Sequence, residues 1–206
     1  MTEEDSRKLF HNLKNDLASM TALLNLHKLY KDSIGTEEML NRLFERQTVI
    51  ATAYEKLYQE GDYPNVGLVL FINELLSRES SRLQIYSSNV QIKKEIANLR
   101  LPVKKIIPLG QVLVELLSNS YRHAFKAASN DRIIEFHITE NNEKLKFDYM
   151  DNGSGFTEGF IPLKSRTLGM QFITALSKQL GGVPEFDISN KDCGVRFSLE
   201  ITIKKD

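Results

Sequence analysis

The sequence contains little cysteine, no excess charge of either sign and no long apolar run. The single cysteine, Cys193, excludes an internal disulfide framework and a multi-cysteine metal site, and the simplest interpretation is a reducing compartment. Lys and Arg together number 27, as do Asp and Glu, so the basic excess typical of a nucleic-acid-binding domain is missing. We therefore expect no nucleic-acid partner.

No apolar stretch approaches the ~18–20 residues that a membrane-spanning helix needs. The N-terminal string MTEEDSRKLF is charged and lacks the apolar segment of a signal peptide. The sequence therefore predicts no membrane segment and a cytoplasmic protein. It also lacks a GxxxxGK[ST] string, which excludes a P-loop as a nucleotide-binding element.

What the sequence does contain is a helical first part. A length of 206 residues is enough for one large domain or two small ones, and a hydrophobic content of 41% is enough for a packed core. An apolar seam at alternating steps of three and four residues predicts one long helix over 4–31, and a second helix follows from Thr36 to about Tyr58. The seam consists of Phe10, Leu13, Leu17, Met20 and Leu24, with His27 at its end. Two amphipathic helices joined by a short turn predict an antiparallel hairpin, and their exposed seam favours a homodimeric four-helix bundle.

The string GDYPN at 61–65 breaks the helical pattern and predicts a domain boundary, with a helical hairpin over 1–62 and a second domain over 63–206. The second domain mixes helix and strand patterns, which predicts an α+β protein whose second domain is a two-layer α/β sandwich. The predicted helices are about 67–84, Pro108 to about Ala127, and about 167–180. The predicted strands are 89–95, a hairpin of 132–139 and 144–150 turning at Asn141-Asn142, and 194–203.

The most informative string in the second domain is ELLSNSYRHAF, on the helix predicted from Pro108. Glu115, Asn119 and Arg122 share one face of this otherwise apolar helix. Carboxylate and amide oxygens suit Mg²⁺, which prefers hard oxygen ligands, and Arg122 and His123 could reach phosphate oxygens. The alternative is a helix with an ordinary polar face toward solvent.

Two further strings suit a phosphorylated ligand. DNGSGF, at 151–156, follows a predicted strand, and its glycines let the backbone approach a ligand closely. TLGM, at 167–170, opens a predicted helix, whose N-terminal N–H groups can bind phosphate. The alternatives are a common Asp-Asn-Gly turn and a plain helix start. Each string alone is weak, and the order of all three is specific.

Together these strings resemble a known family. ELLSNSYRHAF, DNGSGF and TLGMQFITALSKQLGG resemble the N, G1 and G2 boxes of the histidine-kinase ATPase domain, a fold shared with gyrase, and GVRFSLEI resembles its last strand. Upstream, HNLKNDL at 11–17 is similar to the H-R-x-K-N-N-L string of one subgroup of dimerisation helices. The resemblance covers about residues 8–203.

The resemblance implies ATP and Mg²⁺ as cofactors and a role for each matching residue. His11 would accept the phosphoryl group, Asn119 would hold Mg²⁺, and Glu115 would position or polarise groups near that metal. Asp151 would accept a hydrogen bond from the adenine amino group. The other matching positions are the phosphate contacts Arg122 and His123, the nucleotide wall Gly153 and Gly155, and the loop over the phosphates formed by Leu168, Gly169 and Met170. The loop 157–166, with Lys164 and Arg166, would form a lid.

The string around His11 departs from the family pattern. Asn12 follows the histidine, where many histidine kinases have an acid and the subgroup usually has Arg. Lys8 stands where the subgroup has an acid. Asp16, or a group from elsewhere, would then have to supply the base.

The resemblance predicts a two-component histidine kinase core that phosphorylates His11 from Mg-ATP and passes the group to an aspartate of a response-regulator receiver domain. Asn15 matches a position linked in related families to orienting water, which gives the hypothesis of phosphatase activity. Two alternatives remain open at this point. One is a histidine phosphotransfer protein loaded by another protein, and the other is an ATP-driven clamp or serine kinase of the same superfamily.

Overall fold

The structure is a computed structural model. It describes residues 7, 11, 13–15, 18, 21, 35–125, 131–165, 167–187 and 194–203. The described positions before residue 35 are helical, in agreement with the helix predicted over 4–31. The other positions of that helix, including most of its apolar seam, lie outside the described residues.

Four helices occupy the described part of the chain after residue 35. They are α2 (Thr36–Glu60), α3 (Leu68–Leu83), α4 (Val103–Asn119) and α5 (Leu168–Gln179). A π-helical turn, η1 (Ser120–Ala124), continues α4, and a 3-10 turn, η2 (Pro162–Lys164), precedes α5. The helices predicted over 36–58, 67–84 and 167–180 are thereby confirmed.

The strands form one large sheet and one small ribbon. The five-stranded sheet has the order β2-β4-β5-β7-β6, in which β2 and β4 are parallel and the other neighbours are antiparallel. Its strands are β2 (Val90–Ile96), β4 (Arg132–Asn141), β5 (Lys144–Asp151), β6 (Pro184–Asp187) and β7 (Arg196–Thr202). β1 (Asn65–Gly67) and β3 (Arg100–Pro102) pair antiparallel in the ribbon.

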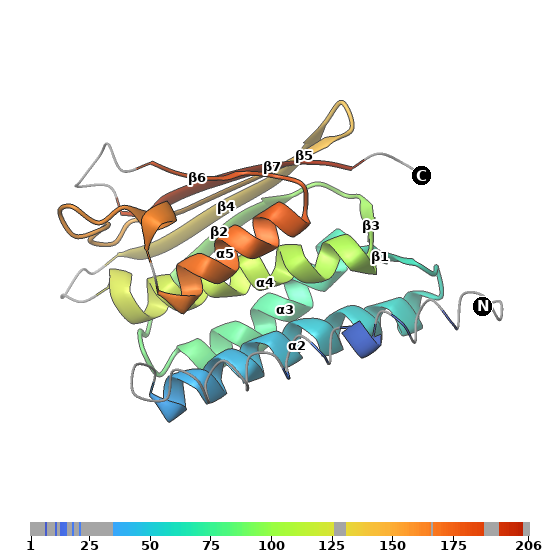
Figure 1. The fold of residues 1–206 in the computed structure, drawn as a ribbon, viewed down its shortest axis with the longest axis horizontal. Coiled ribbons are helices and arrows are strands. Elements are labelled where there is room, and N and C mark those ends of the chain that lie inside the picture. Colours follow the sequence, from blue (N-terminus) through green and yellow to red (C-terminus); the bar gives the residue numbers. More distant parts are fainter. Residues whose placement is uncertain are drawn as a thin grey trace.

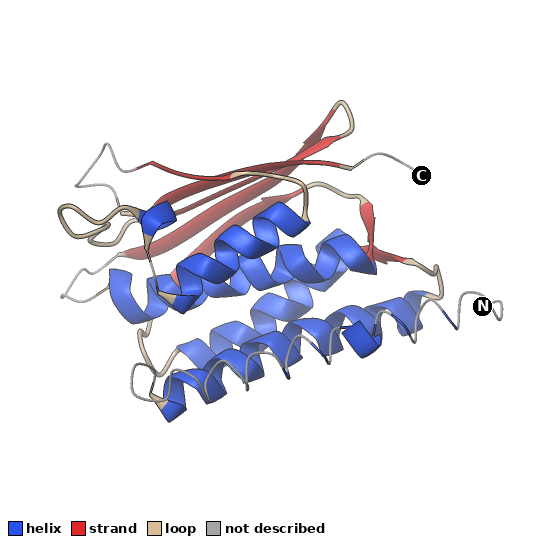
Figure 2. Ribbon diagram, in the orientation of Figure 1, coloured by secondary structure: helices blue, strands red, loops and turns tan. Residues whose placement is uncertain are grey.

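The described helices all lie on one side of the large sheet (Figure 2). α4 and α5 lie beneath the sheet, and α2 and α3 form a further layer on the far side of α4 (Figure 1). This arrangement confirms the mixed α+β class. The dimeric four-helix bundle stays a prediction.

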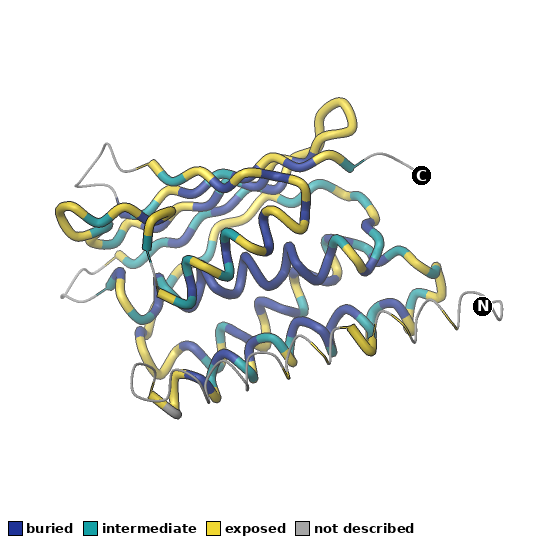
Figure 3. Tube along the Cα trace, in the orientation of Figure 1, coloured by how far each residue is buried: buried dark blue, intermediate teal, exposed yellow. Residues whose placement is uncertain are grey.

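α4 is the centre of this arrangement and is buried along most of its length (Figure 3). One continuous apolar core joins Val49 and Ala53 of α2 to Phe71 of α3, Leu113 of α4 and Phe136 of β4. α2 therefore contributes to the core that supports the sheet. The domain boundary at 62/63 stays a prediction. α2 ends at Glu60, just before it, and Gly61 caps the helix in the left-handed conformation with a φ of 66°.

The prediction that a helix starts at Pro108 is wrong. α4 starts at Val103, directly after Pro102, and Pro108 lies inside it. An internal proline removes one helical hydrogen bond and costs about 3 kcal/mol or more. The extra turn buries Ile106 and Ile107, at about 1.5–3 kcal/mol for each side chain, which offsets that cost. The α-helix also ends earlier than predicted, at Asn119, where the π turn begins.

Other differences are local. The hairpin of β4 and β5 turns on Asn142 and Glu143, with φ of 49° and 60°, and not on Asn141-Asn142. Positive φ at both central residues is typical of a tight hairpin turn. The sequence analysis missed β1, β3 and β6, which are too short to carry an alternating pattern. None of the described helices is both long and apolar enough to cross a membrane.

Candidate functional site

Glu115 is buried in an ion pair with α2. Its side chain on α4 is 8% exposed, and Arg42 Nη1 of α2 donates to its two carboxylate oxygens at 2.6 and 2.8 Å. Glu38 accepts a further bond from Arg42 Nη2 at 2.9 Å. The sequence analysis missed Arg42, because a charged residue on an amphipathic helix is normally assigned to its solvent face.

Burial is the largest influence on the pKa values of Glu115 and Arg42. Burial raises the pKa of Glu115, and the charge of Arg42 opposes this shift without cancelling it. Burial lowers the pKa of Arg42, but Glu115 and Glu38 raise it on balance. The two short bonds join both oxygens of the Glu115 carboxylate to a guanidinium of this chain, so the carboxylate is occupied in this structure.

Glu45, also on α2, binds side chains of α3, α4 and η1. Its Oε1 accepts hydrogen bonds from Ser118 Oγ at 2.8 Å, Arg82 Nη2 at 2.9 Å and Arg122 Nη2 at 3.0 Å. The guanidinium of Arg122 also lies over the ring of Tyr86, 5.1 Å from its centroid. Arg122, predicted to contact phosphate, is therefore held by α2 and by Tyr86 in the segment that follows α3.

Two polar groups at this end of α4 lack partners. Among the described residues, neither Asn119 Nδ2 nor Arg122 Nε has a hydrogen-bond partner, although both atoms are buried. Buried donors without acceptors are rare in folded proteins, and each costs about 1–3 kcal/mol. Both groups are donors, which suits an anionic ligand. His123, in the same π-helical turn, is exposed.

Asp151 ends β5 and is buried at 3% exposure. Its Oδ2 accepts a hydrogen bond from Ser120 Oγ at 2.6 Å. Its Oδ1 accepts from the backbone N–H groups of Gly153 at 2.9 Å and Val195 at 3.2 Å. The carboxylate is thus fixed by η1 on one side, and by its own loop and the residue before β7 on the other. Ser120 was not singled out from the sequence, although it directly follows Asn119.

The predicted glycines occupy positions of close approach. A Cβ at Gly153 would lie 2.3 Å from Ala124 Cβ, so the loop packs directly on the end of η1. A Cβ at Gly169 would lie 2.3 Å from Glu115 Oε1, which brings the N-terminus of α5 onto the ion pair. Gly155 has a φ of 66°, a conformation that glycine adopts without strain. Leu168 and Met170, on either side of Gly169, are partly buried.

The structure therefore brings most of the predicted nucleotide residues to one end of α4. Lys164 lies in η2, is exposed and precedes this end of α5, whereas Arg166 lies outside the described residues.

His11 and Asn15 form a separate pair on the first helix. Both side chains are exposed, and Asn15 Nδ2 lies 3.2 Å from His11 Nδ1. Lys8, Asn12 and Asp16 lie outside the described residues, so the departures around His11 have no structural description.

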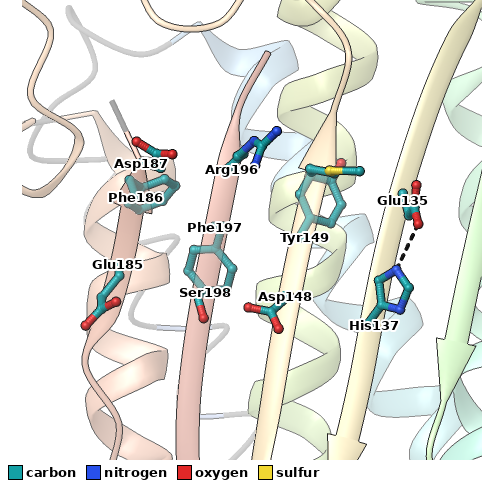
Figure 4. A pocket seen from close by; sticks show the side chains of 11 residues that line it. Glu135, His137, Asp148, Tyr149, Glu185, Phe186, Asp187, Arg196, Phe197 and Ser198 are labelled. Carbon is teal, nitrogen blue, oxygen red and sulfur yellow. Dashed lines mark hydrogen bonds and ion pairs between the residues drawn. The ribbon is translucent and has the colours of Figure 1, made fainter. Parts of the chain in front are cut away.

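A wider hollow lies elsewhere, on the open face of the sheet. It has a volume of about 370 Å³, and Glu135, His137, Asp148 and Arg196 are among its lining residues (Figure 4). The space beside Arg42 and Glu115 is only about 10 Å³. Size alone favours the hollow, but the end of α4 holds buried donors that have no partner among the described residues, together with close-packed glycines, and it is therefore the candidate site.

Comparisons with known proteins find similarity to histidine kinases. A family model described as histidine kinase matches residues 9–83. Sensor histidine kinase PdtaS of Mycolicibacterium smegmatis is 26% identical over 178 residues, which cover 85% of this chain and 35% of that protein. Blue-light-activated histidine kinase 2 of Erythrobacter litoralis is 21% identical over 202 residues, which cover 95% of this chain and 56% of that protein. The chain thus spans about a third of the length of its mycobacterial relative, at 35%.

Solved structures show the same fold. The histidine kinase domain of the Erythrobacter litoralis blue-light activated kinase EL346 aligns with a TM-score of 0.69 at 16% identity, covering 94% of this chain and 96% of that one. Acinetobacter baumannii histidine kinase AdeS aligns with a TM-score of 0.55 at 15% identity, covering 95% and 98%. Together with the sequence matches, these findings confirm the resemblance to the catalytic core of sensor histidine kinases.

Proposed function

We propose that this chain is the kinase core of a two-component system, which transfers the γ-phosphoryl group of ATP to His11 and then to an aspartate of a response-regulator receiver domain. The observation that carries the proposal is the convergence of three separate strings at one end of α4. Glu115 lies against Gly169, and Asp151 is bonded through Ser120 to the turn that follows Asn119. The similarity to sensor histidine kinases supplies the substrate class.

The residues at the end of α4 fit ATP with Mg²⁺. The Asn119 amide oxygen is a hard ligand of the kind Mg²⁺ prefers, and Mg²⁺ when bound would neutralise charge on the phosphate oxygens. The unpaired Asn119 Nδ2 and Arg122 Nε are donors suited to phosphate oxygens. Asp151 offers an acceptor suited to the adenine amino group. The roles of His123, Gly155, Leu168 and Met170 stay proposals on the same resemblance.

Asn15 can set which nitrogen of His11 is nucleophilic. The structure places the Asn15 amide nitrogen, a donor, toward His11 Nδ1, which corresponds to the tautomer with the proton on Nε2. Rotating that amide by about 180° places its acceptor oxygen there instead. When the amide oxygen faces the ring, Nδ1 keeps its proton and Nε2 carries the lone pair. We propose that Asn15 holds this tautomer, which would leave Nε2 free to attack phosphorus.

His11 must approach the nucleotide residues for transfer to occur. In Figure 1 the described segment 13–15 and the loop 152–165 lie at different positions along the long axis of the molecule. Transfer therefore requires either a movement of α2 relative to the sheet layer or a second chain. The first route starts from release of the contacts that Arg42 and Glu45 make with α4.

The test is incubation of the purified chain with γ-labelled ATP and Mg²⁺, beside His11→Ala and Asn119→Ala variants. We expect an acid-labile, alkali-stable label that is absent from both variants. His123→Ala, which removes an exposed side chain of the same turn, should reduce the label less than Asn119→Ala. A label that persists in His11→Ala would contradict the assignment of His11.

A second role for Asn15 is removal of phosphate from the receiver domain. We propose that its exposed amide orients a water molecule toward the phosphoaspartate. An Asn15→Ala chain should then dephosphorylate a phosphorylated receiver domain more slowly, and Lys14→Ala, an exposed neighbour on the same helix, serves as the control. Equal rates for the parent chain and Asn15→Ala would rule out this role.

A histidine phosphotransfer protein without its own kinase activity is the second candidate. The observation that favours it is the ion pair of Glu115 with Arg42, which occupies a carboxylate that the kinase would use. This candidate predicts ATP binding without a label, and labelling of His11 only when another phosphorylated protein is added. The ATP-driven clamp predicts ATP binding without any labelling of His11.

We also propose that the chain is a homodimer. α2 exposes the apolar side chains of Leu40 at 49%, Phe44 at 56% and Tyr58 at 90%. Exposed apolar side chains along one helix are typical of a surface that packs against another chain. Sedimentation velocity of the purified chain tests this directly, and a single species of 23.6 kDa at micromolar concentration would contradict it.

A further inference from the structure

Three buried side chains form a polar chain through the apolar layer between α4 and the sheet. Tyr149, Ser120 and Asp151 are 2%, 3% and 3% exposed. Ser120 Oγ lies 2.8 Å from the hydroxyl of Tyr149 and 2.6 Å from Asp151 Oδ2. Tyr149 and Asp151 are two positions apart on β5, so both point toward the helices, and Ser120 at the start of η1 lies between them.

Chemistry fixes the direction of these hydrogen bonds. An ionised carboxylate only accepts, so the Ser120 hydroxyl donates to Asp151. Its oxygen is then the acceptor for the hydroxyl of Tyr149. Burial raises the pKa of Tyr149 well above its usual range, and the negative charge of Asp151 adds to this shift, so Tyr149 keeps its proton and stays a donor.

The acceptor sites of Asp151 are nearly all used. A carboxylate offers about four lone-pair sites, two on each oxygen. On Oδ1, the N–H groups of Gly153 and Val195 use both, and on Oδ2 the Ser120 hydroxyl uses one. Counting the contacts of the described residues, one site is left, on Oδ2. That site accepts one N–H donor, and it repels a carbonyl oxygen placed in the same position.

We propose that Ser120 and Tyr149 are positioning residues that set the nucleobase preference of the chain, by fixing the rotation of Asp151 so that its last acceptor site faces the 6-amino group of a purine. This inference rests on the proposed role of Asp151 in nucleotide binding. It adds that the preference depends on a serine and a tyrosine that do not themselves contact the base. Tyr149 acts only through Ser120.

The test compares two nucleotides by isothermal titration calorimetry on the full chain with Mg²⁺. The probes are ATP and purine riboside triphosphate, which lacks the 6-amino group. A hydrogen bond to a charged group is worth about 1.5–3 kcal/mol, so Ser120→Ala should weaken ATP binding about tenfold or more. The same variant should leave the affinity for the analogue unchanged, because the analogue makes no bond to Asp151.

Tyr149→Phe provides an independent variant, since the Ser120 bond to Asp151 remains. It should weaken ATP binding about two- to fivefold, as expected for loss of one neutral hydrogen bond, with no effect on the analogue. The double variant should match Ser120→Ala alone, because Tyr149 acts through Ser120. Ser177→Ala is the control: this buried serine of α5 has no hydroxyl partner among the described residues, and the variant should change neither affinity.

The outcomes separate this inference from the proposed function. A parent chain that binds neither nucleotide contradicts the proposed function. A parent chain that prefers ATP, together with variants that keep the same ratio of ATP to analogue affinity, overturns the inference and leaves the proposed function standing. Equal losses for both nucleotides in Tyr149→Phe would also overturn it, since they would indicate a structural role alone.

Discussion

Removing Arg42 gives a sharp test of how α2 is attached to the rest of the molecule. The Arg42 and Glu115 side chains are 7% and 8% exposed, so neither charge is solvated by bulk water. Removing one partner of such a pair leaves a buried charge without a counterion, which costs about 3–5 kcal/mol. For a chain of this size, about 1 kcal/mol shifts Tm by about 2–4 °C, so Arg42→Ala should lower Tm by roughly 6–20 °C.

The loss in Arg42→Ala should depend on pH. Burial already raises the pKa of Glu115 from 4.5, and loss of the nearby cation raises it further. A carboxyl whose pKa is raised on folding binds more protons in the folded state, so its contribution is fully present below pH 4.5 and is lost as pH rises through the folded pKa. The difference in Tm between variant and parent should therefore be smallest near pH 4.5 and grow toward pH 8.

The assay is thermal unfolding followed by circular dichroism across this pH range. Adding Glu115→Gln to Arg42→Ala removes the charge and should recover part of the loss at pH 8. Arg78→Ala, which removes the exposed pairs with Glu55 and Glu74, is the control and should cost no more than about 1 kcal/mol. A loss in Arg42→Ala no larger than that of the control, or one independent of pH, would refute this reasoning.

Three further predictions concern other parts of the molecule. Gly110→Ala places a Cβ 2.7 Å from Phe71 Cζ and should cost about 1–3 kcal/mol in urea unfolding. Gly35→Ala should cost little, because among the described residues no atom beyond the local backbone lies within 4 Å of the new Cβ. Hydrogen bonds to Glu135 and, to a smaller extent, Glu95 raise the pKa of His137. The stabilising contribution of His137 is therefore present below pH 6.5 and is lost as pH rises through the folded pKa. NMR titration should give a lower pKa for His137 in Glu135→Gln. Phe44→Ser should weaken a homodimer in sedimentation velocity, and an unchanged association constant would exclude α2 from its interface.

Local patterns in the sequence predicted the helices and strands whose apolar residues recur with a helical or an alternating spacing. The alternation of Phe147 and Tyr149 with charged residues located β5, and the helical spacing of Phe71, Ile72 and Leu75 located α3. The sequence prediction failed where burial of apolar side chains outweighed a local conformational preference. Pro108 marks a helix start on propensity alone, but Ile106 and Ile107 extend α4 past it.

Partners far apart along the chain could not be predicted. Arg42 and Glu115 are 73 positions apart, and no pattern within α2 distinguishes an arginine that faces a buried carboxylate from one that faces water. Glu45 and Ser118 have the same separation and the same ambiguity. The motif strings identified which residues of α4 matter, and only the packing of α2 against α4 shows what those residues contact.

The contacts of α2 involve two of the side chains proposed to serve the nucleotide. Glu115 is bound to Arg42, and Arg122 is bound to Glu45. If ATP binds as proposed and contacts either side chain in place of α2, the contact with α2 must break. The cost of breaking it makes the free energy of ATP binding less favourable. Thermodynamic linkage makes the effect reciprocal, so bound ATP must weaken the attachment of α2 to α4 by the same factor by which that attachment weakens ATP binding. If transfer to His11 proceeds by movement of α2, as the first of the two proposed routes has it, these two charged contacts couple ATP binding to that movement.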